Sequence, residues 1–149
     1  MSAPVVFTVA FGSYAAGHQL ADHWLQTGPQ ALGKGAPGWP GRRACASHVA
    51  VYTLTLAAFL AAAAWWLAVP ASPGRAAAGL AASAATHYFA DRREPLRKLT
   101  AALGRSVVPG KAAMWDLGAA PFGGAYALDQ SWHVAWLFAA ALITAGGPR

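Results

Sequence analysis

The sequence predicts an all-α integral membrane protein, a bundle of four transmembrane helices with a short amphipathic helix at the membrane surface. Of its 149 residues, 56% are hydrophobic and only 11% are charged, against about 25% charged in an ordinary soluble domain. Four apolar stretches follow one another, and the segments between them carry nearly all of the basic residues. A soluble fold of this size needs more polar surface, so we expect one membrane domain spanning residues 1–149.

The first two predicted spans cover about residues 3–26 and 44–69. The first is apolar up to Gly17 and polar after it. No basic residue precedes it and no small-residue cleavage site follows, so we interpret it as a retained span and not as a signal peptide. The second carries no charge after His48, and at ~1.5 Å per residue it is long enough to cross a hydrocarbon core of ~30 Å.

The third predicted span, about residues 75–91, is short and rich in Ala, Gly and Ser. Small residues let helices approach closely in lipid, so we expect it to pack tightly within the bundle. In the following segment, 92–124, leucines recur at helical spacing beside basic residues, which predicts the amphipathic surface helix. The fourth predicted span covers about residues 125–145.

The distribution of Lys and Arg predicts how the chain crosses the membrane. The predicted loops 27–43 and 92–124 hold three and six basic residues, whereas only Arg75 and Arg149 lie on the opposite side. By the positive-inside rule both loops are cytoplasmic and both termini lie outside, as in a multi-pass protein of the bacterial inner membrane.

The net charge of +6 raises the question of which partners the chain binds. No aromatic and basic nucleic-acid motif accompanies the charge, so we expect membrane lipids with anionic headgroups as partners, and no nucleic acid. The sequence leaves oligomerisation open. Cys45 is the single cysteine, which excludes an intrachain disulfide.

Three pairs of histidine and aspartate, each four residues apart, are the strongest functional signal. Four-residue spacing places two side chains on one helical face, one turn apart, and ionisable residues in apolar helices are costly and usually functional. The predicted topology brings all three pairs and one further histidine to the cytoplasmic level. The predicted metal ligands are His18, Asp22, His48, His87, Asp91, Asp129 and His133.

These residue types predict metal chemistry, because neutral histidine and ionised carboxylate are ligands for zinc and manganese. A bound divalent transition metal activates water, and one of the carboxylates Asp22, Asp91 and Asp129 is then a candidate general base. Lys34, Arg92 and Arg93 are candidates for binding an anionic substrate. The leading hypothesis is a metal-dependent membrane hydrolase acting on a phosphorylated or lipid-like substrate.

Two alternatives use the same residues. One is a structural subunit in which the polar side chains only hydrogen-bond the helices together. The other is a metal or proton transporter, although few polar residues continue toward the far side of the predicted bundle. Neither His23, about 100° round the helix from Asp22, nor Asp116, near two glycines, receives a role.

The order of the polar motifs also carries a family resemblance. The motifs are His18-Gln-Leu-Ala-Asp22-His-Trp-Leu-Gln26-Thr27, Lys34, Ser47-His48-Val-Ala-Val-Tyr52-Thr53, Thr86-His87-Tyr-Phe-Ala-Asp91-Arg92 and Leu128-Asp129-Gln130-Ser-Trp-His133. From about His18 to His133 the chain resembles a family of small bacterial and phage membrane proteins known only as a domain of unknown function.

The resemblance implies a four-span helical membrane protein with recurring His, Asp and Gln positions, and it implies no activity. One departure is that the lysine expected soon after Arg92 is replaced by Arg93, and the next lysine is Lys98. The pattern is also loosely similar to membrane-bound metal-dependent hydrolases, a likeness of pattern alone.

Overall fold

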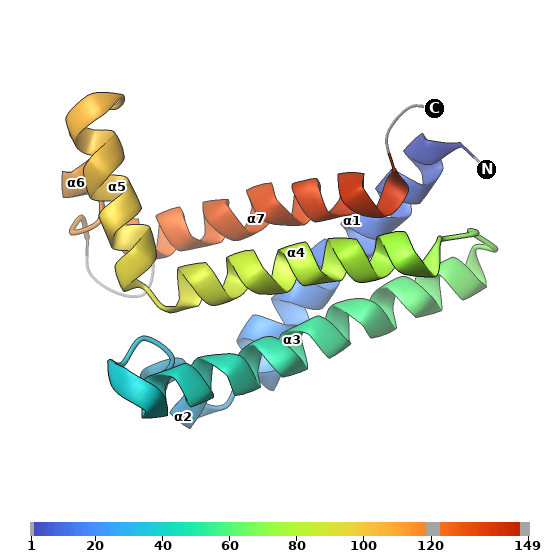
Figure 1. Ribbon diagram of the computed structural model, residues 1–149, viewed down its shortest axis with the longest axis horizontal. Coiled ribbons are helices and arrows are strands. Elements are labelled where there is room, and N and C mark those ends of the chain that lie inside the picture. Colours follow the sequence, from blue (N-terminus) through green and yellow to red (C-terminus); the bar gives the residue numbers. More distant parts are fainter. Residues whose placement is uncertain (1, 119–122, 147–149) are drawn as a thin grey trace.

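The computed structural model describes residues 2–118 and 123–146, and in these residues every regular element is a helix. The predicted all-α class is therefore confirmed. Four long helices run alternately in opposite directions, so that both ends of the chain lie at the same end of the bundle (Figure 1). They are α1 (Ala3–Leu20), α3 (Gly38–Trp66), α4 (Pro73–Asp91) and α7 (Gly124–Ala145).

Short helices lie between the long ones, one at the end of the predicted first span and three within the predicted loops 27–43 and 92–124. They are the π-helix η1 (Ala21–Leu25), α2 (Gly28–Gly33), α5 (Glu94–Ser106) and α6 (Lys111–Met114). Helix α2 forms because Thr27 and Gln30 make a reciprocal capping box at its start. Helix α3 begins six residues before the predicted second span, and it accommodates Pro40 because a proline in the first turn breaks no helical hydrogen bond.

The four long helices close into a ring, in which α1 and α4 each pack against both α3 and α7. The approach of α4 to α7 is close at Gly79, where a Cβ atom would clash with Thr144 and lie 2.6 Å from the carbonyl oxygen of Ala140. Hydroxyl groups in this core are paired. Tyr14 and Thr144 lie 2.8 Å apart, and Tyr52 and Ser83 lie 2.7 Å apart.

Helix α3 alone, within the described residues, is long and apolar enough to cross a membrane by length and composition. Helices α1, α4 and α7 do not meet this criterion, although they coincide closely with the other three predicted spans. Helix α1 has 18 residues and α4 has 19, many of them Ala, Gly or Ser. By length and composition, α3 is therefore one candidate span.

Helix α5 is amphipathic, as predicted, and projects from one end of the bundle (Figure 1). Leu96 and Thr100 are buried, whereas Arg97, Lys98 and Arg105 are exposed. Arg93, which joins α4 to α5, has φ 59° and ψ −55°.

This backbone conformation at Arg93 is a γ-turn, since the amide of Glu94 donates to the carbonyl oxygen of Arg92 at 2.6 Å. Such a turn is rare and strained for a residue with a side chain. Strain of this kind persists where the surrounding structure holds it, commonly at a functional site.

Candidate metal centre

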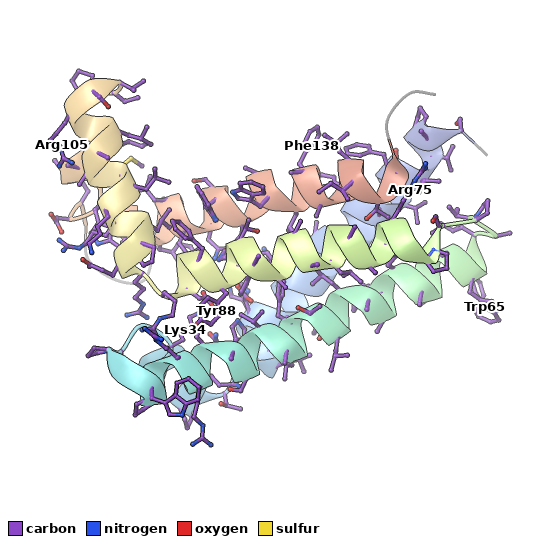
Figure 2. All side chains as sticks on the ribbon, viewed as in Figure 1. Lys34, Trp65, Arg75, Tyr88, Arg105 and Phe138 are labelled. Atoms are coloured by element: carbon purple, nitrogen blue, oxygen red, sulfur yellow. The ribbon has the colours of Figure 1, made fainter. Side chains whose placement is uncertain are left out.

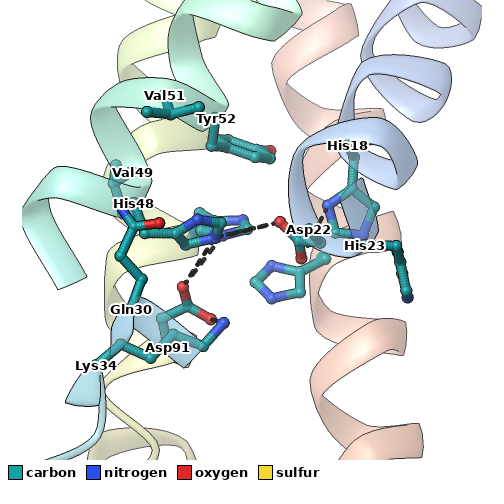
Figure 3. Close-up of polar contacts among 12 residues, drawn as sticks. His18, Asp22, His23, Gln30, Lys34, His48, Val49, Val51, Tyr52 and Asp91 are labelled. Carbon is teal, nitrogen blue, oxygen red and sulfur yellow. Dashed lines mark hydrogen bonds and ion pairs between the residues drawn. The ribbon is translucent and has the colours of Figure 1, made fainter. Parts of the chain in front are cut away.

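The alternating helix directions bring every predicted His/Asp pair to one end of the bundle. The last turns of α1 and α4 meet the first turns of α3 and α7 there, and Figure 3 shows the resulting cluster. The side chain of Asp129 is 27% exposed and that of Asp22 is 8% exposed. The remaining members of the predicted ligand set are fully buried, namely His18, His48, His87, Asp91 and His133.

A π-turn shapes the contribution of the first helix. The amide of Gln26 donates to the carbonyl oxygen of Ala21 at 2.9 Å, an i to i+5 bond that closes η1. Such turns occur mostly as single insertions within α-helices, frequently at functional sites. Asp22 lies in this turn, with Oδ2 3.5 Å from His18 Nδ1 and Oδ1 3.3 Å from His48 Nε2.

Four side-chain atoms from three helical segments converge at the centre of the cluster. They are Asp22 Oδ1, His48 Nε2, His87 Nε2 and Asp91 Oδ2. The two Nε2 atoms are 3.1 Å apart. Asp22 Oδ1 lies 3.3 Å from the His48 nitrogen and 3.6 Å from that of His87, and for Asp91 Oδ2 these distances are 3.4 and 3.2 Å.

These five separations are in the range found between ligand atoms that share one metal ion. Ligand atoms about 2.0 to 2.1 Å from a zinc ion in tetrahedral geometry lie about 3.3 to 3.4 Å from one another. Two imidazole nitrogens and two carboxylate oxygens are also a donor set that suits zinc. The residues therefore fit a divalent transition metal in both spacing and chemistry.

Hydrogen bonding does not account for the two carboxylate oxygens among these four atoms. Among the described residues, Asp22 Oδ1 and Asp91 Oδ2 are buried without a hydrogen-bond partner. Buried polar atoms are paired in the great majority of cases, and two buried carboxylates near each other repel. One cation at the centre would give both oxygens a partner and would balance both charges.

Neighbouring side chains fix the orientation of the central residues. The ring of His87 lies between Tyr52 and His133, with ring centroids 3.8 and 4.2 Å away. Lys34 Nζ lies 2.7 Å from Asp91 Oδ1. Such outer contacts orient metal ligands and tune their affinity. Nothing local in the sequence links Tyr52 to His87, so residue spacing does not predict this contact.

The remaining predicted ligands lie beside the four converging atoms. His133 Nε2 is 3.5 Å from Asp129 Oδ2. Gln130 connects the two sides, since its amide nitrogen donates to Asp129 Oδ2 at 3.3 Å and its carbonyl oxygen is 3.4 Å from His18 Nε2. Two further triads have ligand atoms within metal-binding reach of one another, His18 with Asp22 and His87, and Asp91 with Asp129 and His133.

The three cations predicted to bind an anion have three different environments. Lys34 pairs with Asp91. Arg92 donates to the carbonyl oxygens of Lys34 and Ala36 at 2.6 and 2.7 Å, which ties this loop to the end of α4. Arg93 remains exposed, and its guanidinium donates a long hydrogen bond of 3.4 Å to the carbonyl oxygen of Ala31.

The two residues left without a role in the sequence analysis lie on the surface. His23 is exposed and points away from the cluster (Figure 3), with Nδ1 3.1 Å from the carbonyl oxygen of Gln19. Asp116 is exposed and follows α6.

A cavity of about 460 Å³ opens beside the central atoms. Small-molecule sites typically measure ~300 to 1,000 Å³. Three carboxylates of the cluster and two cations reach the cavity, and two aromatic side chains form part of its wall. These residues are Asp22, Asp91, Asp129, Lys34, Arg93, Trp115 and Tyr126. A small ligand can therefore reach the buried site through this cavity.

Comparison of the chain with protein-family models, with curated proteins and with solved structures gives no match. The class that the fold and site define is therefore a helical protein with a candidate metal centre, and the family resemblance stays a prediction.

Proposed function

We propose that this protein is a metal-dependent hydrolase of the bacterial inner membrane that acts on a phosphorylated or lipid-like substrate. The single observation that carries the proposal is the convergence of Asp22 Oδ1, His48 Nε2, His87 Nε2 and Asp91 Oδ2, in which each carboxylate oxygen lies 3.2 to 3.6 Å from both imidazole nitrogens. The charges agree with it, because two carboxylates and two neutral imidazoles form a neutral assembly with one divalent ion, and a neutral assembly is far less costly to bury.

The cavity favours catalysis over a purely structural metal. A divalent ion bound by the cluster supplies Lewis acidity and lowers the pKa of water toward neutrality. Asp129 lines the cavity next to the central residues and is only partly buried. Its carboxylate is well placed to accept a proton from water, which is the role of a general base.

Arg93 supports an anionic substrate. Its aliphatic stem crosses Gly35, where an added Cβ atom would lie 2.8 Å from Arg93 Cδ. The guanidinium lies on the cavity wall and pairs with no carboxylate within the described residues. A guanidinium in this position suits the paired oxygens of a phosphate group.

Exposed apolar faces support a membrane location with four spans. Leu54, Val134, Phe138, Leu142 and Ile143 are each at least 41% exposed, and Figure 2 shows Phe138 directed outward from α7. Exposed contiguous apolar surface of this kind is typical of a lipid-facing bundle.

The lengths and ends of the helices agree with this location. At ~1.5 Å per residue the 22 residues of α7 extend over ~33 Å, enough for a hydrocarbon core of ~30 Å. Exposed tryptophans at both ends match interfacial belts, with Trp24 and Trp39 near the site and Trp65 and Trp66 at the other end. The basic loops share the site end, which favours the cytoplasmic side for the cavity.

The two alternatives have less support. A transporter needs a polar path, yet the core beyond the site is filled by Leu56, Leu60 and Leu137, and the far end by Val6, Val69 and Ala145. A network that only holds helices together needs each buried polar atom paired, and two carboxylate oxygens at the centre are not.

Elemental analysis of the purified protein in detergent tests the metal centre. After zinc or manganese supplementation the wild type is expected to retain the ion stoichiometrically, and His48→Ala is expected to lose it. His23→Ala removes an exposed histidine from the same end and is expected to retain the ion. A wild type with no bound transition metal would overturn the proposal.

The hydrolase activity needs its own assay. Metal-loaded wild type in lipid nanodiscs is expected to release phosphate from a soluble aryl phosphate or from a phosphatidic acid, and His48→Ala is not. Metal binding without release from either substrate would refute the hydrolase and leave the metal centre standing.

A further inference from the structure

We propose that the cluster is a two-metal centre bridged by Asp91, with the second ion held by Asp91, Asp129 and His133. This inference rests on the proposed metal centre, whose four atoms belong to Asp22, His48, His87 and Asp91. It assigns a second position to Asp129 and His133, which hold no ion in the first, so that Asp129 serves as a ligand in place of a general base. It also narrows the substrate to a phosphate monoester.

The second triad has the contacts that a metal position needs. One ligand atom from each of Asp91, Asp129 and His133 lies within 4.8 Å of the other two. His133 is 2% exposed, and its Nε2 atom is buried without a hydrogen-bond partner among the described residues. The nearest carboxylate oxygen is Asp129 Oδ2 at 3.5 Å, a separation suited to two ligands on one ion.

Asp91 is the residue that both positions share. Its Oδ2 atom faces the two Nε2 atoms of the first position, and its Oδ1 atom is held by Lys34. Two-metal sites in phosphatases and nucleases place their ions ~3.5 to 4 Å apart. One carboxylate oxygen shared by both ions can span this distance, so Oδ2 can bridge them while Oδ1 stays with Lys34. The stacked rings of His87 and His133, with centroids 4.2 Å apart, supply one nitrogen to each position.

The charge balance indicates which substrate the second ion serves. Asp22, Asp91 and Asp129 are neutralised by one divalent ion together with Lys34. A second divalent ion gives the site two excess positive charges, beside a cavity that Asp91 and Asp129 line. A phosphate monoester is a dianion near neutral pH, so it balances this excess, and the second ion is expected to bind together with a phosphate group.

Metal stoichiometry in the presence of inorganic phosphate tests the inference. Wild type loaded with manganese is expected to hold two ions per chain, and its electron paramagnetic resonance spectrum is expected to show an exchange-coupled pair. Asp129→Ala and His133→Ala are each expected to hold one ion with the six-line spectrum of isolated manganese. Asp116→Ala removes an exposed carboxylate that does not line the cavity, so it is the control and is expected to hold two.

The outcomes separate this inference from the proposal on which it rests. One ion in the phosphate-containing wild type would overturn the two-metal centre and leave the first position intact. Loss of both ions from Asp129→Ala would also overturn it, since the residues would then form one composite site. No ion in the wild type would refute the metal centre itself. One retained ion in a variant shows that the variant is folded.

Discussion

The two ends of the bundle are built from the same four helices and treat their buried polar groups in opposite ways. At the end holding the chain termini, the hydroxyls of Tyr14 and Thr144 are paired and Arg75 donates to the carbonyl oxygen of Ala145. At the other end, buried oxygens of Asp22 and Asp91 have no hydrogen-bond partner within the described residues. The first end pairs its polar groups within the protein. The second end has carboxylate oxygens that need a bound ligand as their partner.

The largest expected effect tests whether stability resides in the packed part of the bundle. Leu137 is 1% exposed, so Leu137→Ala is expected to lower the free energy of unfolding by about 2 to 5 kcal/mol through lost contacts and a cavity. Its metal content is expected to stay at the wild-type value. Leu142→Ala on the exposed face of the same helix is the control, with little change in stability. Equal losses from both would contradict the packing described here.

Removing the metal tests whether a bound ion stabilises the end of the bundle that holds the His/Asp cluster. An ion present at about 100 times its dissociation constant adds about 2.7 kcal/mol of stability to the folded state. Chelation is therefore expected to lower the unfolding temperature of the wild type, measured in detergent by differential scanning fluorimetry. His48→Ala lacks a central ligand and is expected to show no response to the chelator. A wild type that does not respond would count against metal binding in the cluster.

A smaller effect concerns the side chain that holds Asp91. Lys34→Met removes the ammonium group 2.7 Å from Asp91 Oδ1. Loss of a contact that orients a ligand typically lowers metal affinity ~10 to 100-fold, and isothermal titration with zinc would measure it. Lys98→Met removes a lysine that is exposed on α5 and is expected to leave the affinity unchanged. An unchanged affinity in Lys34→Met would show that Lys34 does not position Asp91.

The smallest expected effects come from two variants that distinguish the backbone strain at Arg93 from the charge of its side chain. Arg93→Gly relieves a positive φ and is expected to raise the free energy of unfolding by about 1 kcal/mol, while weakening phosphate binding to metal-loaded protein. Gly35→Ala displaces the arginine stem and keeps its charge. We expect it to weaken phosphate binding without the gain in stability. Unchanged phosphate binding in both variants would remove Arg93 from the substrate site.

Local spacing predicted much of the site. The i, i+4 spacing of each pair predicted that its two side chains share a helical face, and in each pair they lie 3.2 to 3.5 Å apart. Loop charges predicted that the pairs and His48 occupy one end of the bundle, because consecutive spans alternate in direction. The first inference needs only a short stretch of chain, and the second needs only the order of the helices.

Local spacing and loop charge do not predict contacts between distant segments. The ion pair of Lys34 with Asp91 and the bonds from Arg92 to the 34–36 loop join residues more than 50 positions apart. No periodicity encodes them, and the sequence analysis grouped Lys34, Arg92 and Arg93 as equivalent cations. The strained turn at Arg93 also has no compositional signal, since turns with positive φ usually carry glycine.

The π-turn at the end of α1 has a consequence for how this site can change over evolutionary time. A π-turn holds one residue more than the α-helical turn it replaces. Deleting one residue from 21–25 would let an ordinary α-helix form, and Asp22 and the segment leading to Lys34 would move out of register with His48 and Asp91. Substitution at the exposed positions Trp24 and Leu25 disturbs no such register. In this segment the number of residues is therefore more constrained than their identity.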